Sequence, residues 1–305
     1  MSLSHTQNRD AQTRMLDPQV LGALSNLELV AKAVVEGFVQ GLHRSPKHGF
    51  SQEFVEYRAY TEGDDPRYID WNVFARTGKT YIKRFLGETN THLMILLDCS
   101  ASMGFGSQNI SKLRFGKFLA ASLAYLASRQ HDAVGVMVFN EDVVDYRPPA
   151  SKPGSLQGVI HTLDRAEAVQ GTVLGKPFTR FQEQIKKRGL VAVISDFYCD
   201  PQELKESIQP LSMHGQDVMI FHLLDPQELT PDIKEATLFE DMETGRAIEV
   251  SPAFMRKDYP ARIRAHVQAI GDAARGIGAD HVLVDTGEPL DRVLHNYLTF
   301  REKRG

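Results

Sequence analysis

Hydroxyl and carboxylate side chains alternate directly after an apolar run in the first half of the chain. Residues 93–97 read Leu-Met-Ile-Leu-Leu, and Asp98, Ser100 and Ser102 follow them. A turning loop would aim these three side chains at one point, where their hard oxygens suit Mg²⁺ or Mn²⁺ better than Zn²⁺ or copper. Asp and Ser also begin helices well, so these residues alone predict a capping turn about as strongly as a metal site.

The residues before Asp98 predict the element that positions it. An unbroken apolar run of this length is typical of a strand that is buried on both faces of a parallel sheet. Asp98 then lies at the carboxyl end of that strand, the edge at which ligands bind in open α/β sheets.

Strand and helix patterns alternate along the rest of the chain. Further buried strands are predicted at 133–139, 190–194, 217–224 and 281–284. Helices are predicted at 112–129, 155–165, 201–214, 260–277 and 290–301. This alternation predicts an α/β fold with a mostly parallel sheet and helices on both of its faces.

A second predicted strand also ends on an acid, and a hydroxyl lies between the two acids in the sequence. Asp196 follows the strand at 190–194, and Thr172 lies on a turn before a helix. At this point the sequence resembles the von Willebrand factor A domain, whose metal-ion-dependent adhesion site combines an Asp-x-Ser-x-Ser loop, a distant Thr and a later Asp. The matching residues are Asp98, Ser100, Ser102, Thr172 and Asp196. One departure is Phe197, because adhesion domains more often have Thr-Asp-Gly where this chain has Ser-Asp-Phe.

The resemblance implies a particular metal chemistry. Ser100, Ser102 and Thr172 would supply neutral oxygens, and Asp98 and Asp196 would act directly or through water. An ion held in this way is short of negative ligands, so its open position favours a carboxylate from another molecule. A partner's Asp or Glu would complete the coordination.

The segment before the sheet narrows the resemblance. Strands are predicted at 54–60 and 80–86, after one amphipathic helix at 19–41. Residues 60–71, Tyr-Thr-Glu-Gly-Asp-Asp-Pro-Arg-Tyr-Ile-Asp-Trp, resemble a bacterial family labelled domain of unknown function fifty-eight. Members of that family carry a von Willebrand factor A-like domain and are commonly associated with MoxR-type AAA+ ATPases. The resemblance therefore implies such an ATPase as a partner.

The expected organisation has three parts. Residues 1–18 form a flexible N-terminus, 19–90 an N-terminal helix with a family-specific β segment, and 91–305 the von Willebrand factor A-like domain. Within 19–90 the single tryptophan, Trp71, is expected to anchor the segment to the core. We also expect a short edge strand at 143–146, stopped by prolines, and a hairpin at 236–250.

Composition limits the classes of function. The 305 residues carry a formal net charge of −4, so no basic excess is available for nucleic acid. No apolar run reaches the roughly 20 residues of a membrane-spanning helix. With only two cysteines, a cytoplasmic protein is expected. Cys99 and Cys199 both follow strand ends, which raises the hypothesis that they oxidise together near the metal edge.

Catalytic motifs are absent around the predicted site. No Gly-x-Ser-x-Gly elbow surrounds Ser100 or Ser102, and the chain has neither a P-loop nor a Gly-x-Gly-x-x-Gly turn after a strand. We therefore expect a non-enzymatic protein-interaction module that binds an acidic residue through Mg²⁺ or Mn²⁺. The alternative is an Mg²⁺- or Mn²⁺-dependent hydrolase at the same site, which would need a general base that the sequence does not identify.

Overall fold

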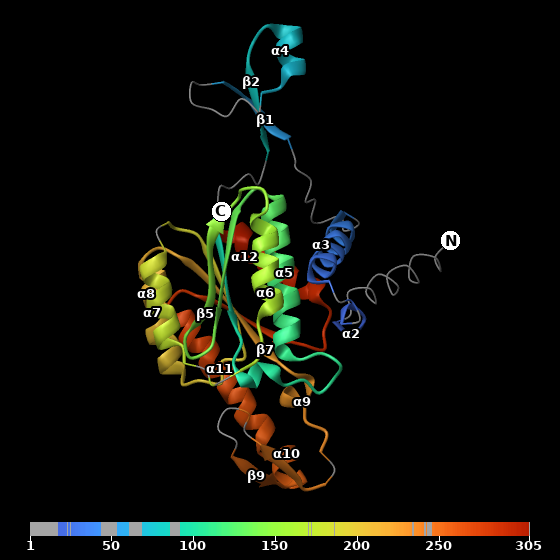
Figure 1. The fold of residues 1–305 in the computed structure, drawn as a ribbon, viewed down its shortest axis with the longest axis vertical. Helices are drawn as coiled ribbons and strands as arrows, with labels where there is room; N and C mark the ends of the chain where they lie inside the picture. Colours follow the sequence, from blue (N-terminus) through green and yellow to red (C-terminus); the bar gives the residue numbers. More distant parts are fainter. Residues whose placement is uncertain are drawn as a thin grey trace, which may run out of the picture.

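A six-stranded sheet forms the centre of the computed structural model (Figure 1). The structure describes residues 18–22, 24, 26–43, 54–60, 69–85, 92–169, 171, 173–185, 187–233, 235–240, 242 and 246–304. The strand order across the sheet is β10-β7-β6-β3-β4-β5. The strands are β3 (His92–Asp98), β4 (Ala133–Phe139), β5 (Val143–Ala150), β6 (Leu190–Ser195), β7 (Asp217–Leu224) and β10 (Asp280–Asp285).

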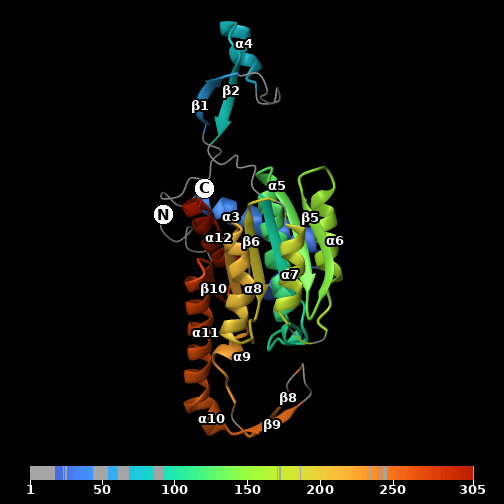
Figure 2. The same ribbon diagram turned by 90° about the vertical axis from the view of Figure 1, so that its left-hand side faces the viewer.

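Only β5 runs antiparallel to its neighbour, and the other five strands are parallel. Helices cover both faces, as Figure 1 shows with the sheet viewed roughly along its edge; Figure 2 looks onto one of the two faces. On one face lie α3 (Leu27–His43), α5 (Lys112–Arg129), α6 (Ser155–Arg165) and α12 (Leu290–Arg304); on the other lie α7 (Gly175–Gln184), α8 (Pro201–Met213) and α11 (Tyr259–Gly276). This arrangement confirms the predicted fold class.

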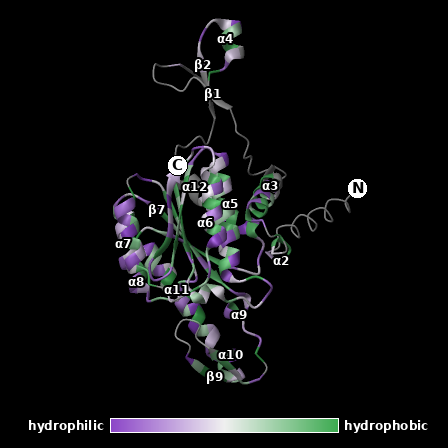
Figure 3. Cartoon of the chain, viewed as in Figure 1, coloured by the Kyte–Doolittle hydropathy of each residue, from purple (hydrophilic) through white to green (hydrophobic). Residues whose placement is uncertain are grey.

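Strand β3 is buried on both faces because its side chains alternate between two cores. Leu93, Ile95 and Leu97 pack with the helices of the first face, while Met94 and Leu96 pack with those of the second. The helices turn apolar residues toward the sheet and hydrophilic ones outward (Figure 3). Asp98 is thereby fixed at the carboxyl end of β3, which is hydrogen-bonded to β6 on one side and to β4 on the other.

The N-terminal helix is interrupted, so the predicted single helix at 19–41 is wrong. α2 (Pro18–Leu21) ends at Gly22, and a new helix, α3, starts at Leu27. The side chain of Asn26 accepts a hydrogen bond from the Leu29 backbone N–H at 3.0 Å, a local helix-start signal. α3 packs on α5 through its buried apolar face.

The predicted β segment forms a small unit of its own. β1 (Phe54–Ala59) and β2 (Tyr81–Phe85) pair antiparallel, and α4 (Trp71–Thr77) lies between them in sequence. The expectation for Trp71 is wrong: its side chain is 60% exposed and contacts the ring of Phe74, which is 41% exposed.

The edge strand is longer than predicted. β5 continues through Pro148 and Pro149 to Ala150. Prolines are tolerated there because β5 is the last strand of the sheet and its pairing with β4 shifts register between Val134 and Val136. The chain between β7 and α11 forms α9 (Pro226–Leu229), the predicted hairpin of β8 (Thr237–Glu240) and β9 (Ala247–Val250), and α10 (Pro252–Lys257).

Within the described part of the chain, no helix combines the length and apolar character needed to cross a membrane. Residues 1–17 lie outside the described residues.

Candidate metal centre at the carboxyl edge of the sheet

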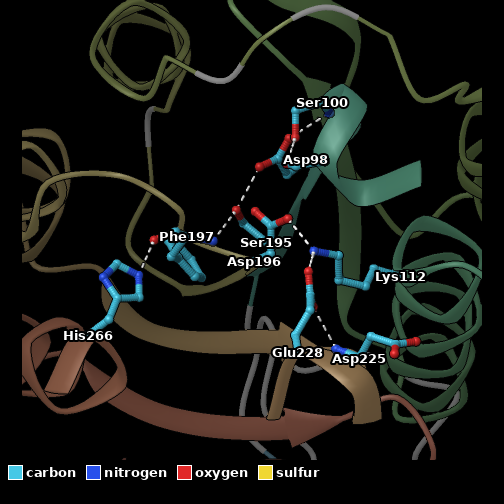
Figure 4. A network of polar contacts seen from close by, with 10 residues as sticks. Asp98, Ser100, Lys112, Ser195, Asp196, Phe197, Asp225, Glu228 and His266 are labelled. Carbon is cyan, nitrogen blue, oxygen red and sulfur yellow. Dashed lines mark hydrogen bonds and ion pairs between the residues drawn. The ribbon is translucent and has the colours of Figure 1, made fainter. Parts of the chain in front are cut away.

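The ends of β3 and β6 form the floor of the predicted site. The two strands are parallel neighbours, with Leu97 paired to Ile194, so the residues that follow them lie side by side. The Ser195 hydroxyl donates a hydrogen bond to Asp98 Oδ2 at 2.6 Å (Figure 4). Asp98, Ser195 and Asp196 are all essentially buried.

The loop after β3 brings two hydroxyls together above Asp98. The Ser100 backbone N–H donates to Asp98 Oδ1 at 2.8 Å, which turns the chain back over the carboxylate. Ser102 lies in the short 3-10 helix η2 (Ala101–Gly104), and its Oγ is 3.1 Å from Ser100 Oγ. Ser100 is fully buried and Ser102 is partly exposed.

The spacing of the two hydroxyls fits a small hard cation. Two adjacent ligands of an octahedral ion at about 2.1 Å would lie about 3.0 Å apart, close to the 3.1 Å observed between the Oγ atoms. The same distance also permits a hydrogen bond between them when no ion is present. The distance between the two hydroxyls is thus compatible with a small hard cation.

The electrostatics of Asp98 also fit a cation. Burial and the nearby Asp196 carboxylate raise the pKa of Asp98 to about 7, although hydrogen bonds from Ser195 and Ser100 oppose the rise. The buried carboxylate therefore lacks sufficient compensating positive charge. A divalent ion would supply it.

Thr172 lies outside the described residues. The chain just before it does approach the site, because the Val169 backbone N–H donates to the Cys99 carbonyl at 3.0 Å. Four of the five predicted site residues can be placed, and the structure brings Asp98, Ser100 and Ser102 together around one point.

Asp196 has a different environment from the one that the sequence predicts. Its Oδ2 accepts a hydrogen bond from Lys112 Nζ at 2.7 Å, and the same ammonium is 2.6 Å from Glu228 Oε1 (Figure 4). Sequence reasoning missed both Lys112 and Glu228. A signal for Lys112 exists: it is the first residue of α5, where the helix dipole disfavours a cation.

A further contact fixes the loop between η2 and α5. The Ser107 backbone N–H donates to Asp225 Oδ2 at 2.9 Å, and the Ser107 hydroxyl donates to Asp225 Oδ1. Asp225 also begins α9 through a capping box with Glu228. The carboxyl ends of β3, β6 and β7 are thus joined by one polar network.

Among the described residues, no three His, Cys, Asp or Glu side chains gather as a metal-binding group. The candidate centre consequently depends on hydroxyl oxygens, which is consistent with Mg²⁺ or Mn²⁺ and not with a nitrogen- or sulfur-seeking ion. The cysteines are both free thiols; Cys99 is buried and Cys199 is partly buried.

The family of the chain follows from a match that covers most of it. The family described as "Protein of unknown function DUF58" matches residues 56–269. The chain belongs to this family. The resemblance seen in the sequence is confirmed, and the match runs from within β1 through five of the six strands of the central sheet to most of α11; β10 lies beyond it.

Relatives and solved structures extend the comparison. Uncharacterized proteins of Mycobacterium bovis and Mycobacterium tuberculosis are each 28% identical over 269 residues, covering 86% of this chain and 84% of theirs. An aerotolerance-related membrane protein from Bacteroides fragilis has a TM-score of 0.50 at 18% identity, covering 68% of this chain and 98% of that one. The conserved hypothetical protein BatB from Bacteroides thetaiotaomicron has a TM-score of 0.48 at 18% identity, covering 70% and 99%. At 18% identity, the structure from Bacteroides fragilis shares only its fold with this chain.

Proposed function

We propose that this DUF58 chain is a non-enzymatic protein-interaction module that binds an acidic residue of a partner through Mg²⁺ or Mn²⁺. The observation that carries the proposal is the pair of hydroxyls at Ser100 and Ser102, 3.1 Å apart beside the buried Asp98 carboxylate. An ion held by two neutral oxygens and one carboxylate keeps positive charge and open positions. A partner's Asp or Glu is the natural ligand for them.

The resemblance to a MoxR-associated family supports a MoxR-type AAA+ ATPase as a co-acting partner in assembling or remodelling protein complexes. The unit of β1, β2 and α4 is a second contact surface in this proposal. Its support is the exposed pair of Trp71 and Phe74, whose rings meet edge to face with centroids 6.0 Å apart. Exposed aromatic side chains are enriched at protein interfaces.

Calorimetric titration of Mn²⁺ tests the metal part of the proposal. Wild type is expected to bind one ion, and Asp98→Asn, which keeps the shape of the side chain, is expected to lose binding. Asp272→Asn is the matched control because Asp272 is an exposed aspartate on α11 whose side chain pairs with Arg275. Equal binding by wild type and Asp98→Asn would contradict the proposal.

The hydrolase alternative requires a base beside the ion. The nearby Asp196 carboxylate is a poor base, because its Oδ2 accepts a hydrogen bond from Lys112 Nζ at 2.7 Å. A phosphoester and a peptide substrate should therefore remain intact in the presence of Mn²⁺. Turnover that Asp98→Asn abolishes would favour the hydrolase.

A further inference from the structure

Lys112 is a fully buried ammonium at the edge of the candidate metal centre. Its Nζ lies between two carboxylates, 2.7 Å from Asp196 Oδ2 and 2.6 Å from Glu228 Oε1, as Figure 4 shows. Aromatic rings of Phe105 and Tyr198 cover it, with centroids 5.8 and 5.0 Å from Nζ. The side chain is therefore held in place and has no route to solvent in this arrangement.

The lysine is charged in this environment. Its Nζ is within hydrogen-bond distance of one carboxylate on each side, and two such ion pairs stabilise the ammonium form of a side chain that is otherwise fully buried. The site thus contains a permanent positive charge supplied by the protein itself.

The positive charge of Lys112 changes the net charge of the residues around the candidate metal centre. Asp98, Asp196 and Glu228 carry three negative charges when ionised, and the positive charge of Lys112 neutralises one of them. A divalent ion then makes the loaded cluster neutral. Without the lysine the loaded cluster would keep one negative charge, which would strengthen the hold on the ion and repel an incoming carboxylate.

The contact also restricts Asp196. With Oδ2 committed to Lys112, this carboxylate cannot turn both oxygens toward an ion near Ser100 and Ser102. A position on the ion is therefore left for a ligand from outside. Lys112 would act on a bound ion through Asp196, which it contacts directly.

We infer that Lys112 sets the ligand preference of the centre, weakening the hold on the divalent ion so that the loaded site accepts a carboxylate from another molecule. The inference rests on the proposed function, because it assumes that an ion binds at Asp98, Ser100 and Ser102. It predicts that changes at Lys112 affect metal and carboxylate binding in opposite directions. A merely structural lysine would not produce that reversal.

The test uses Mn²⁺ and acetate with the full chain. Water-proton relaxation reports Mn²⁺ binding, and acetate then displaces water from the bound ion. Lys112→Met should bind Mn²⁺ about tenfold more tightly and acetate about fivefold more weakly than wild type. Lys117→Met is the control, since Lys117 lies on the same helix but bonds to the Asp164 carbonyl, and it should match wild type.

A second variant keeps the test decisive if Lys112→Met does not fold. Glu228→Gln retains the lysine and removes one negative charge, so it should bind Mn²⁺ more weakly and acetate more tightly than wild type. Suppose that Mn²⁺ binds, but the folded variants have wild-type affinities or change their affinities for Mn²⁺ and acetate in the same direction. The role inferred for Lys112 is then wrong, while the proposed metal centre is retained. If neither wild type nor any variant binds Mn²⁺, the proposed function is wrong, and this inference is overturned with it.

Discussion

The hydroxyl of Ser195 joins two strands at the candidate site by donating to Asp98 Oδ2 at 2.6 Å while accepting from the Phe197 backbone N–H at 3.0 Å. One side chain thus orients a site carboxylate and fixes the turn that follows β6. Both contacts are buried, so their loss leaves polar groups without solvent to replace them.

Replacing Ser195 by Ala should therefore destabilise the protein by about 1–3 kcal/mol, measured by urea unfolding. Ser207→Ala provides the control: Ser207 is also buried, but its hydroxyl has no hydrogen-bond partner among the described residues. That substitution should change the free energy of unfolding little. Equal losses in the two variants would show that the Ser195 contacts contribute nothing specific.

Phe197 occupies a backbone conformation that normally favours glycine. Its φ is 47°, in the left-handed region, while its ring is buried and meets His222 edge to face at 5.6 Å between centroids. Both Phe197→Ala and Phe197→Gly should lose the ring's packing, about 3–5 kcal/mol. Because a Cβ is strained at this φ, the glycine variant should be the more stable of the two by about 1 kcal/mol.

Calorimetric melting of both variants measures that order. In most buried positions alanine is preferred over glycine. A more stable alanine variant would therefore contradict the left-handed assignment at residue 197.

The cysteines should be unreactive in the folded protein. Cys99 is fully buried, and burial raises the pKa of the Cys199 thiol to about 12, with nearby carboxylates adding to the rise. At pH 8 only about one Cys199 in ten thousand would be a thiolate. Iodoacetamide should label neither residue until urea unfolds the chain, as followed by mass spectrometry. Rapid labelling of Cys199 in native protein would contradict this prediction and would support the hypothesis of a redox pair.

Acid should destabilise the pair of histidines between β7 and β10. His222 Nδ1 and His281 Nε2 are 3.2 Å apart, and burial followed by the Arg275 charge lowers the pKa of His281 to about 4. Because the unfolded histidine binds a proton near pH 6.5, the unfolded state holds more protons than the native state between pH 6.5 and 4. The stability contributed by neutral His281 is present above pH 6.5 and is lost as the pH falls through 4.

His281→Asn removes this titration. Melting temperatures should therefore fall less steeply between pH 6.5 and 4 in the variant than in wild type. His295→Asn is a suitable comparison, since His295 lies on the exposed side of α12. Parallel pH profiles for wild type and His281→Asn would contradict the lowered pKa.

The elements around the site were predictable because their signals are local. The apolar run before Asp98 and the amphipathic pattern after it predict β3 and α5 closely. The break between α2 and α3 was missed although Gly22 and Asn26 mark it, since the apolar spacing continues across the gap. Strand β5 was predicted at the sheet edge but was ended before its prolines; it passes through them because its pairing with β4 shifts register there, which no local pattern indicates.

The polar network was less predictable because its members are far apart in sequence. Lys112 meets Asp196 across 84 residues and Glu228 across 116. Charged residues at such separations have many possible partners, and only the topology that places β6 and β7 side by side selects these two. Trp71 illustrates the same limit, because an aromatic residue in a short segment can face either a core or a partner.

The most direct test of the account is the position of Mn²⁺ in crystals grown with that ion. Anomalous diffraction should show one peak at the carboxyl edge of the sheet, about 2.1 Å from both Ser100 Oγ and Ser102 Oγ. The peak should be absent from crystals of Asp98→Asn. A peak at another place, or none at a saturating Mn²⁺ concentration, would contradict the assignment of this centre.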